Sequence, residues 1–114
     1  MDNCIFCKIV DGTIPAKKVY EDEDMIAIED INPVAPHHLL LIPKKHVVNA
    51  LDLAPEDDRL VGRVFRVAAE IARQRGVEER GFRIVQNSNA DAGQSVFHIH
   101  FHLLAGRHLG WPPG

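Results

Sequence analysis

The sequence of 114 residues contains few cysteines, no long hydrophobic run and no excess of basic charge. Its two cysteines are too few for the disulfide framework of a small secreted protein. No apolar run approaches the roughly 20 residues of a membrane-spanning helix, and the N-terminus lacks the basic and apolar segments of a secretion signal. The formal net charge of -3 disfavours nucleic-acid binding through bulk positive charge. We therefore expect a cytoplasmic protein with no membrane or nucleic-acid partner.

The composition is that of an ordinary globular protein, with 46% hydrophobic and 25% charged residues. A chain of this length can bury about two thirds of its surface, which is enough for one core without disulfides. Because no repeat, linker or low-complexity segment interrupts the chain, residues 1–114 are expected to form one domain. The unusual count is seven histidines, three of which alternate within five residues.

Two helices are expected, one long and one short. The long helix is predicted from Pro55 to Arg75, with Gly76 as its stop. A short helical turn is predicted over residues 4–12, ended by Gly12. The residues expected to form the apolar stripe of the long helix are Leu60, Val61, Val64, Phe65, Ala68, Ile71 and Ala72.

Strands are predicted on both sides of the long helix. They begin at Val19 and cover residues 25–31, 38–42, 82–85 and 96–104. The run at 38–42 is continuously apolar after His38, which indicates burial on both faces. Short turns within each group of strands predict an α+β domain with a mainly antiparallel sheet.

The most informative segment is residues 97–103, where apolar residues alternate with histidines. Side chains on a strand point to opposite faces in turn, so the histidines would share one face, about 7 Å apart. Imidazoles at this spacing can flank a phosphate and act as nucleophile or proton donor. Two alternatives remain open: plain surface histidines, or a catalytic metal site with Asp30 or Asp91 as its base. The expected core residues are Phe97, Ile99, Phe101 and Leu103, and the expected site residues are His98, His100 and His102.

The preceding segment, residues 87–95, is rich in turn formers and hydrogen-bond donors. Gly93 would allow a ligand to approach the backbone closely. Ser95 offers a hydroxyl and Asn87 an amide. Without the histidines this would be an ordinary polar connection, but its position before them favours a phosphate ligand.

The segment 93–104, Gly-Gln-Ser-Val-Phe-His-Ile-His-Phe-His-Leu-Leu, resembles the motif of the histidine triad family. The C-terminal segment 105–114 resembles the ending of the nucleotide-binding branch of that family, as do segments 14–17, 30–33 and 38–46. The resemblance implies the histidine triad fold, a mainly antiparallel five-stranded sheet with one long and one short helix. It also implies a homodimer with the long helix at the interface.

The resemblance further implies a purine nucleoside phosphoramidase-like hydrolase that acts on conjugates of AMP or GMP. Such an enzyme cleaves the P–N bond of a nucleoside 5′-phosphoramidate through a covalent nucleotidyl-histidine. His100 matches the nucleophile and His102 a phosphate-binding residue, while Ser95 matches a residue near the leaving group. Asn87 matches a phosphate contact, and His38 a further active-site histidine. By itself, His38 would be taken for a structural residue at a strand end.

The same resemblance implies where the nucleoside binds. Asp30 matches the carboxylate that receives the ribose hydroxyls, and Gly93 and Gln94 belong to the nucleotide-binding loop. An apolar cleft would hold the purine and discriminate weakly between adenine and guanine. Without the resemblance, its residues would be assigned to the core. They are Ile5, Phe6, Ile9, Ile28 and Ile31.

Cys4 and Cys7 form a Cys-x-x-Cys element, which by itself is compatible with a redox pair, two free thiols or half of a zinc site. The resemblance to bacterial members of the family implies a structural Zn²⁺ completed by His46 and His98. In that case His98 would brace the site rather than take part directly in catalysis.

Other functions remain open at this stage. The first alternative keeps the same fold but changes the substrate, so that the chain would be a dinucleoside polyphosphate hydrolase. In other classes it would be a nucleotide-binding regulatory or scaffold protein with incidental hydrolysis, or a metal-dependent hydrolase that uses the histidines as ligands.

Overall fold

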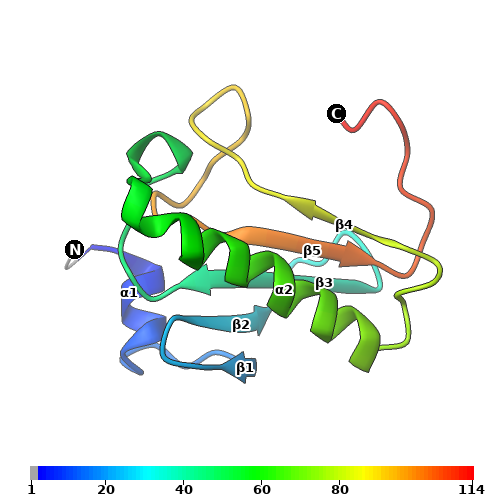
Figure 1. The fold of residues 1–114 in the computed structure, drawn as a ribbon, viewed down its shortest axis with the longest axis horizontal. Helices are drawn as coiled ribbons and strands as arrows, with labels where there is room; N and C mark the ends of the chain where they lie inside the picture. The colour runs from blue at the N-terminus through cyan, green and yellow to red at the C-terminus, as the bar shows by residue number, and fades with distance from the viewer. Residues whose placement is uncertain (1–2) are drawn as a thin grey trace.

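A computed structural model describes residues 3–114 and contains one five-stranded antiparallel sheet with the strand order β1-β2-β3-β5-β4. The predicted α+β class and the antiparallel sheet are confirmed. No helix in this part of the chain has the length and apolar character needed to cross a bilayer. The elements, drawn in Figure 1, are α1 (Ile5–Val10), β1 (Lys18–Glu21), β2 (Met25–Glu29), β3 (His37–Pro43), two 3-10 turns (Ala50–Asp52 and Pro55–Asp57), α2 (Asp58–Gln74), β4 (Phe82–Val85) and β5 (Phe101–Ala105).

The two faces of the sheet carry separate apolar clusters, because successive side chains of each strand point to opposite faces. Leu39 and Leu41 of β3 pack toward α2, which lies across one face of the sheet (Figure 1). Leu40 and Ile42 face the other way and pack with residues of α1. Since β3 is buried on both faces, the prediction from its continuous apolar run is confirmed.

The long helix differs from its prediction in the first turn. Residues Pro55–Asp57 form a 3-10 turn and α2 begins at Asp58. Asp57 is almost completely buried, and its carboxylate accepts hydrogen bonds from the Ala54 N–H at 2.9 Å and the Lys45 ammonium at 2.7 Å. These contacts tighten the turn. The predicted stop at Gly76 is confirmed by its φ of 70°, but Phe65 of the predicted apolar stripe is 49% exposed.

The last strand is shorter than predicted, because regular pairing begins only at Phe101 and not at residue 96. The ladder with β3 starts at the pair Leu41–Phe101, and β3 ends two residues later at Pro43, which has no N–H to donate. The Ile99 N–H donates instead to the Val47 carbonyl at 2.6 Å. The chain therefore leaves the sheet across residues 97–100, and Phe97, predicted to be in the core, is 54% exposed.

The remaining strand predictions hold, with small changes at the ends. β4 has the predicted bounds, and β3 extends one residue beyond its prediction at each end. β2 ends at Glu29, two residues early, because the carboxylate of Asp30 accepts the Asn32 N–H at 2.8 Å and turns the chain. Ile31 therefore lies outside the sheet and is 91% exposed.

Leu41 provides a test of the α2-side core, since it is 1% exposed between β3 and α2. We expect Leu41→Ala to lower the free energy of unfolding by about 2–5 kcal/mol, because it removes buried methyl groups and leaves a cavity. Leu51→Ala is the matched control, since Leu51 is 77% exposed, and should change stability by less than about 0.5 kcal/mol. Urea denaturation measures both variants, and equal effects would contradict the packing described.

Candidate functional site

Asp30, His38 and His102 lie together on the α1 side of the sheet. The register of β3 and β5 pairs Leu40 with His102 and His38 with Leu104, so the two histidines lie diagonally on one face. His38 Nε2 is 2.8 Å from His102 Nδ1 and 3.3 Å from Asp30 Oδ2. Asp30 is held beside them because its N–H donates to the His38 carbonyl at 2.9 Å.

The hydrogen bonds of His38 determine which ring nitrogens carry protons. The Val34 N–H donates to His38 Nδ1 at 3.1 Å, so neutral His38 carries its proton on Nε2. That Nε2–H donates to His102 Nδ1, which leaves the proton of neutral His102 on its own Nε2. The backbone of Val34 thus orients two imidazoles in series.

His100 has the opposite tautomer. Its Nδ1 lies 2.8 Å from the His98 carbonyl, which can only accept, so Nδ1 carries the proton. The Nε2 of neutral His100 therefore carries no proton and has a free lone pair, as a nucleophile requires. The His100 ring lies 5.2 Å from the ring of His102 and 5.0 Å from that of Phe6, the latter at an interplanar angle of 84°. An edge-on aromatic contact of this kind helps to hold the ring.

Burial favours the neutral form of the His100 and His102 imidazoles. It lowers the pKa of His100 below its ordinary value of 6.5. Burial also lowers the pKa of His102 to about 4, with repulsion from His100 and His38 contributing and Asp30 opposing the shift. At neutral pH His102 is therefore a hydrogen-bond donor at Nε2 rather than a cation.

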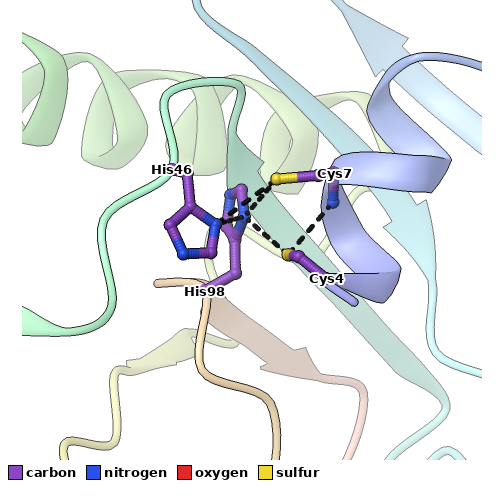
Figure 2. A group of neighbouring side chains, drawn as sticks. All are labelled: Cys4, Cys7, His46 and His98. Atoms are coloured by element: carbon purple, nitrogen blue, oxygen red, sulfur yellow. Dashed lines mark hydrogen bonds between the residues drawn. The ribbon is translucent and has the colours of Figure 1, made fainter. Parts of the chain in front are cut away.

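A second cluster contains Cys4, Cys7, His46 and His98, drawn in Figure 2. The His98 and His46 Nδ1 atoms are 3.1 Å apart, and the Cys4 and Cys7 sulfurs lie 3.3 and 3.5 Å from His98 Nδ1. The His98 Nε2–H donates to the Pro43 carbonyl at 2.7 Å, which leaves a lone pair on Nδ1 directed at the sulfurs. Four ligand atoms within 4.8 Å of one another, two of them sulfur and two imidazole nitrogen, suit a tetrahedral metal ion.

The group of Asp30, His38 and His102 also has three ligand atoms within 4.8 Å, but its donors fit a metal poorly. The facing atom of His38 is Nε2, which carries a proton because Nδ1 accepts from Val34. A metal ion at that atom would require the proton to move to Nδ1, where it would oppose the Val34 N–H. Asp91, the other carboxylate considered for a metal-bound water, is exposed and belongs to neither group.

The three alternating histidines have different neighbours. His98 is fully buried and its ring faces the cysteines, whereas His100 and His102 face each other. The prediction that all three lie on one side of the sheet agrees with their contacts, because Phe6 of the α1-side cluster contacts both His98 and His100, and His102 pairs with Leu40 of the same cluster. Ile99, Phe101 and Leu103 all belong to the α2-side cluster, so Phe97 is the one predicted core position of the four that departs from the alternation.

The loop residues have different environments. Asn87 lies two residues beyond the end of β4 and is half-buried, and its carbonyl accepts a hydrogen bond from Gln86 Nε2 at 2.9 Å. Ser95 is exposed and lines a cavity of about 590 Å³ that opens beside the cysteine cluster. Gly93 has a φ of 85°, which favours glycine. Gln94, in contrast, is buried and bonded to its own protein.

The five residues of the predicted purine cleft differ widely in exposure. Phe6, Ile9 and Ile28 are each 6% exposed and belong to the α1-side cluster. Ile5 and Ile31 are 45% and 91% exposed. Of the buried three, Phe6 contacts the rings of His98 and His100, and contact with a purine remains a prediction for all five.

Two backbone groups that orient the site were not found from the sequence. The N–H of Val34 and the carbonyl of Pro43 set the proton positions of His38 and His98. No side-chain pattern indicates them, because any residue supplies the same backbone atoms.

Comparisons with known proteins agree with this architecture. The family model described as HIT domain matches residues 11–109. An uncharacterised HIT-like protein of Synechocystis is 46% identical over 113 residues, which is 99% of this chain and 98% of that protein. The purine nucleoside phosphoramidase of Escherichia coli K12 is 44% identical over 109 residues, covering 96% and 92%. A solved HIT family hydrolase from Legionella pneumophila has a TM-score of 0.96 at 48% identity, covering 98% of this chain and 100% of that one.

The pKa of His102 provides a test of this geometry. We expect its ring to titrate near pH 4 in the folded protein and near pH 6.5 in the urea-unfolded chain, as followed by NMR of the ring protons. Since the unfolded chain then binds more protons between these values, the contribution of His102 to stability is complete above pH 6.5 and is lost as the pH falls toward 4. A midpoint near 6.5 in the folded protein would contradict the burial of this ring.

Proposed function

The chain belongs to the HIT domain family of nucleotide hydrolases, and on that premise we propose that it cleaves the P–N bond of purine nucleoside 5′-phosphoramidates. The products are a nucleoside monophosphate and an amine, formed through a covalent nucleotidyl-histidine. The observation that carries this proposal is the unprotonated Nε2 of His100, fixed by the Nδ1–H bond to the His98 carbonyl. The 44% identical relative named purine nucleoside phosphoramidase supports the choice of substrate.

The proposed reaction has two displacements. His100 Nε2 attacks the α-phosphorus, the P–N bond breaks, and the leaving nitrogen takes a proton from solvent and departs as the amine; the water of the second displacement returns one proton to solvent. Water then attacks the same phosphorus, the N–P bond to His100 breaks, and the nucleoside monophosphate leaves. The His98 carbonyl, 2.8 Å from Nδ1, stabilises the positive charge that develops on the His100 ring during each displacement.

The neighbouring residues have proposed roles that follow from their hydrogen bonds. His102 donates its Nε2–H to a non-bridging phosphoryl oxygen, and His38 keeps that proton in place by donating to His102 Nδ1. Asp30 retains free lone pairs on its carboxylate for the ribose hydroxyls. In this proposal the Asn87 side chain contacts the phosphate, and the Ser95 side chain lies near the leaving group.

Removal of the nucleophile tests the mechanism directly. We expect His100→Ala to lower kcat/KM for an adenosine 5′-phosphoramidate by at least about 10³-fold, because no other group replaces the covalent step. The exposed His108→Ala is the control and should leave kcat/KM unchanged. A rapid quench in base, in which the P–N bond to histidine is stable, followed by intact-mass measurement should detect one nucleotidyl adduct, and peptide mapping should locate it on His100. An adduct elsewhere, or activity retained by the variant, would exclude the proposed mechanism.

A substrate panel separates the remaining candidates. A dinucleoside polyphosphate hydrolase would prefer dinucleoside polyphosphates to phosphoramidates, and a scaffold protein would bind nucleotides with negligible turnover. The metal-dependent hydrolase is disfavoured by the proton on His38 Nε2. If the protein were a metal-dependent hydrolase, a chelator would abolish turnover while the protein stayed fully folded.

The cluster of Cys4, Cys7, His46 and His98 is proposed to hold a structural Zn²⁺. With four protein ligands the ion would be coordinatively closed, and what it supplies is a cross-link between the N-terminal segment and the chain before β5. Phe6 lies in that segment and contacts both His98 and His100, so the cross-link would also support the nucleophile. Free thiols are required, which agrees with our expectation of a reducing cytoplasm.

Zinc binding is tested by metal analysis and thermal unfolding. We expect about one zinc per chain, and Tm should fall when Cys4 and Cys7 are both changed to serine or when a chelator removes the metal. The same chelator should leave the Tm of the double variant unchanged, which is the control. Absence of zinc from protein purified without chelator would eliminate this proposal.

The homodimer remains a proposal for the protein in solution. β4 is an edge strand of the sheet, and Phe65 of α2 exposes half of its surface next to the buried Phe101. An edge strand and an exposed aromatic ring are both features that a second copy of the chain would cover.

A further inference from the structure

Gln94 lies in the connection between β4 and β5, beside Ser95, and is 7% exposed. Its Oε1 accepts from the Asn89 N–H at 2.8 Å and from Asn49 Nδ2 at 3.1 Å. Its Nε2 donates to the Val48 carbonyl at 2.7 Å and to the Val96 carbonyl at 3.1 Å. Two acceptor sites and two donor protons are the full capacity of a side-chain amide, so every one is used within the protein.

Because all donors and acceptors of the buried Gln94 amide are occupied, none is free to bind a ligand. Contact between the Gln94 side chain and a phosphate would leave a buried carbonyl or N–H without its partner, which is costly. The sequence prediction that Gln94 binds nucleotide is therefore not supported for its side chain. We propose that Gln94 is a positioning residue, which holds the loop so that its neighbour Ser95 meets the leaving group.

The hydrogen bonds of Gln94 close the loop at both ends. Asn89 and Val96 flank the turn at Gly93, and both are bonded through their backbone to the same amide. Asn89 has a positive φ of 69°, uncommon for a residue with a side chain, and the bond from its N–H to Gln94 helps to keep it there. Ser95 lies between the two anchor points, so both bonds restrain the position of its backbone.

The network also joins the loop to the segment that follows the candidate metal ligand His46. Asn49, which is 3% exposed, donates to Asn89 Oδ1 at 3.1 Å as well as to Gln94. Its own Oδ1 accepts the Leu51 N–H at 3.0 Å and caps a 3-10 turn. The loop therefore rests on chain segments outside the reaction site, which makes it a rigid support for Ser95.

This inference rests on the proposed function, because Ser95 has a leaving group to serve only in that reaction. If Gln94 acts through Ser95, its loss should matter where the leaving group needs assistance. We expect Gln94→Glu and Gln94→Met each to lower kcat/KM by about 10- to 100-fold for a phosphoramidate of an alkylamine, a poor leaving group. A substrate with a good leaving group, such as a nitroaryl ester of the nucleotide, should change less than threefold.

A double-variant cycle separates positioning from a general structural effect. In a Ser95→Ala background, Gln94→Glu should lower kcat/KM for the alkylamine substrate by no more than about twofold further, because the residue it positions is gone. The control for the added charge is Gln74→Glu, at an exposed position at the end of α2, which should match the wild type. Multiplicative losses in the double variant, or equal losses for both substrates, would overturn the inference.

NMR provides a test that does not depend on a measurement of enzyme activity. Its first part uses the wild-type protein and therefore applies even if a variant folds poorly. In wild-type protein titrated with AMP, the Gln94 side-chain NH₂ signals should stay in place and exchange slowly, while those of His100 shift. Gln94→Glu or Gln94→Met should increase the backbone mobility of residues 89–96 in the ligand-free protein. Movement of the NH₂ signals with AMP, or an unchanged loop in the variants, would overturn the inference. Failure of AMP to shift His100 would instead refute the proposed function.

Discussion

The hydrogen bond from His100 Nδ1 to the His98 carbonyl is the interaction on which the rest of the site depends. It is a bond between residues two apart in the chain, and it forms because residues 97–100 have left the sheet, so that this carbonyl is not part of a strand ladder. A carbonyl cannot donate, so one nitrogen of the His100 ring is always protonated and the other is left with its lone pair. The backbone thus selects the tautomer.

His98 connects two clusters that have different chemistry. Its carbonyl orients His100, its Nε2–H is held by Pro43, and its Nδ1 faces Cys4 and Cys7. Phe6 adds a second connection, since its ring makes edge-on contacts with both histidines. The candidate metal ligands on one side and the proposed nucleophile on the other therefore share one fully buried residue. The His100 ring is held in one orientation because the groups around it are themselves fixed.

Much of the fold and part of the site could be predicted from local patterns. The run from His38 to Ile42 indicated a strand buried on both faces, and the spacing from Val61 to Ala72 indicated α2, because burial leaves a period in the sequence. The resemblance in segment 93–104 identified the family. Alternation failed at Phe97, since a period of two describes side chains only while the chain remains in a ladder, and β3 ends at Pro43.

By itself the sequence determined the class of fold, the family and the residues from which a phosphate or metal site can be made, because these depend on residue type and spacing. Only the tertiary structure decided how the histidines divide: His98 toward the cysteines, and His38 with His102. It also decided which ring nitrogens carry protons and that the Gln94 amide is used internally. The physical reason is that tautomers and hydrogen-bond saturation depend on backbone groups brought together from distant segments, and every residue carries the same backbone groups.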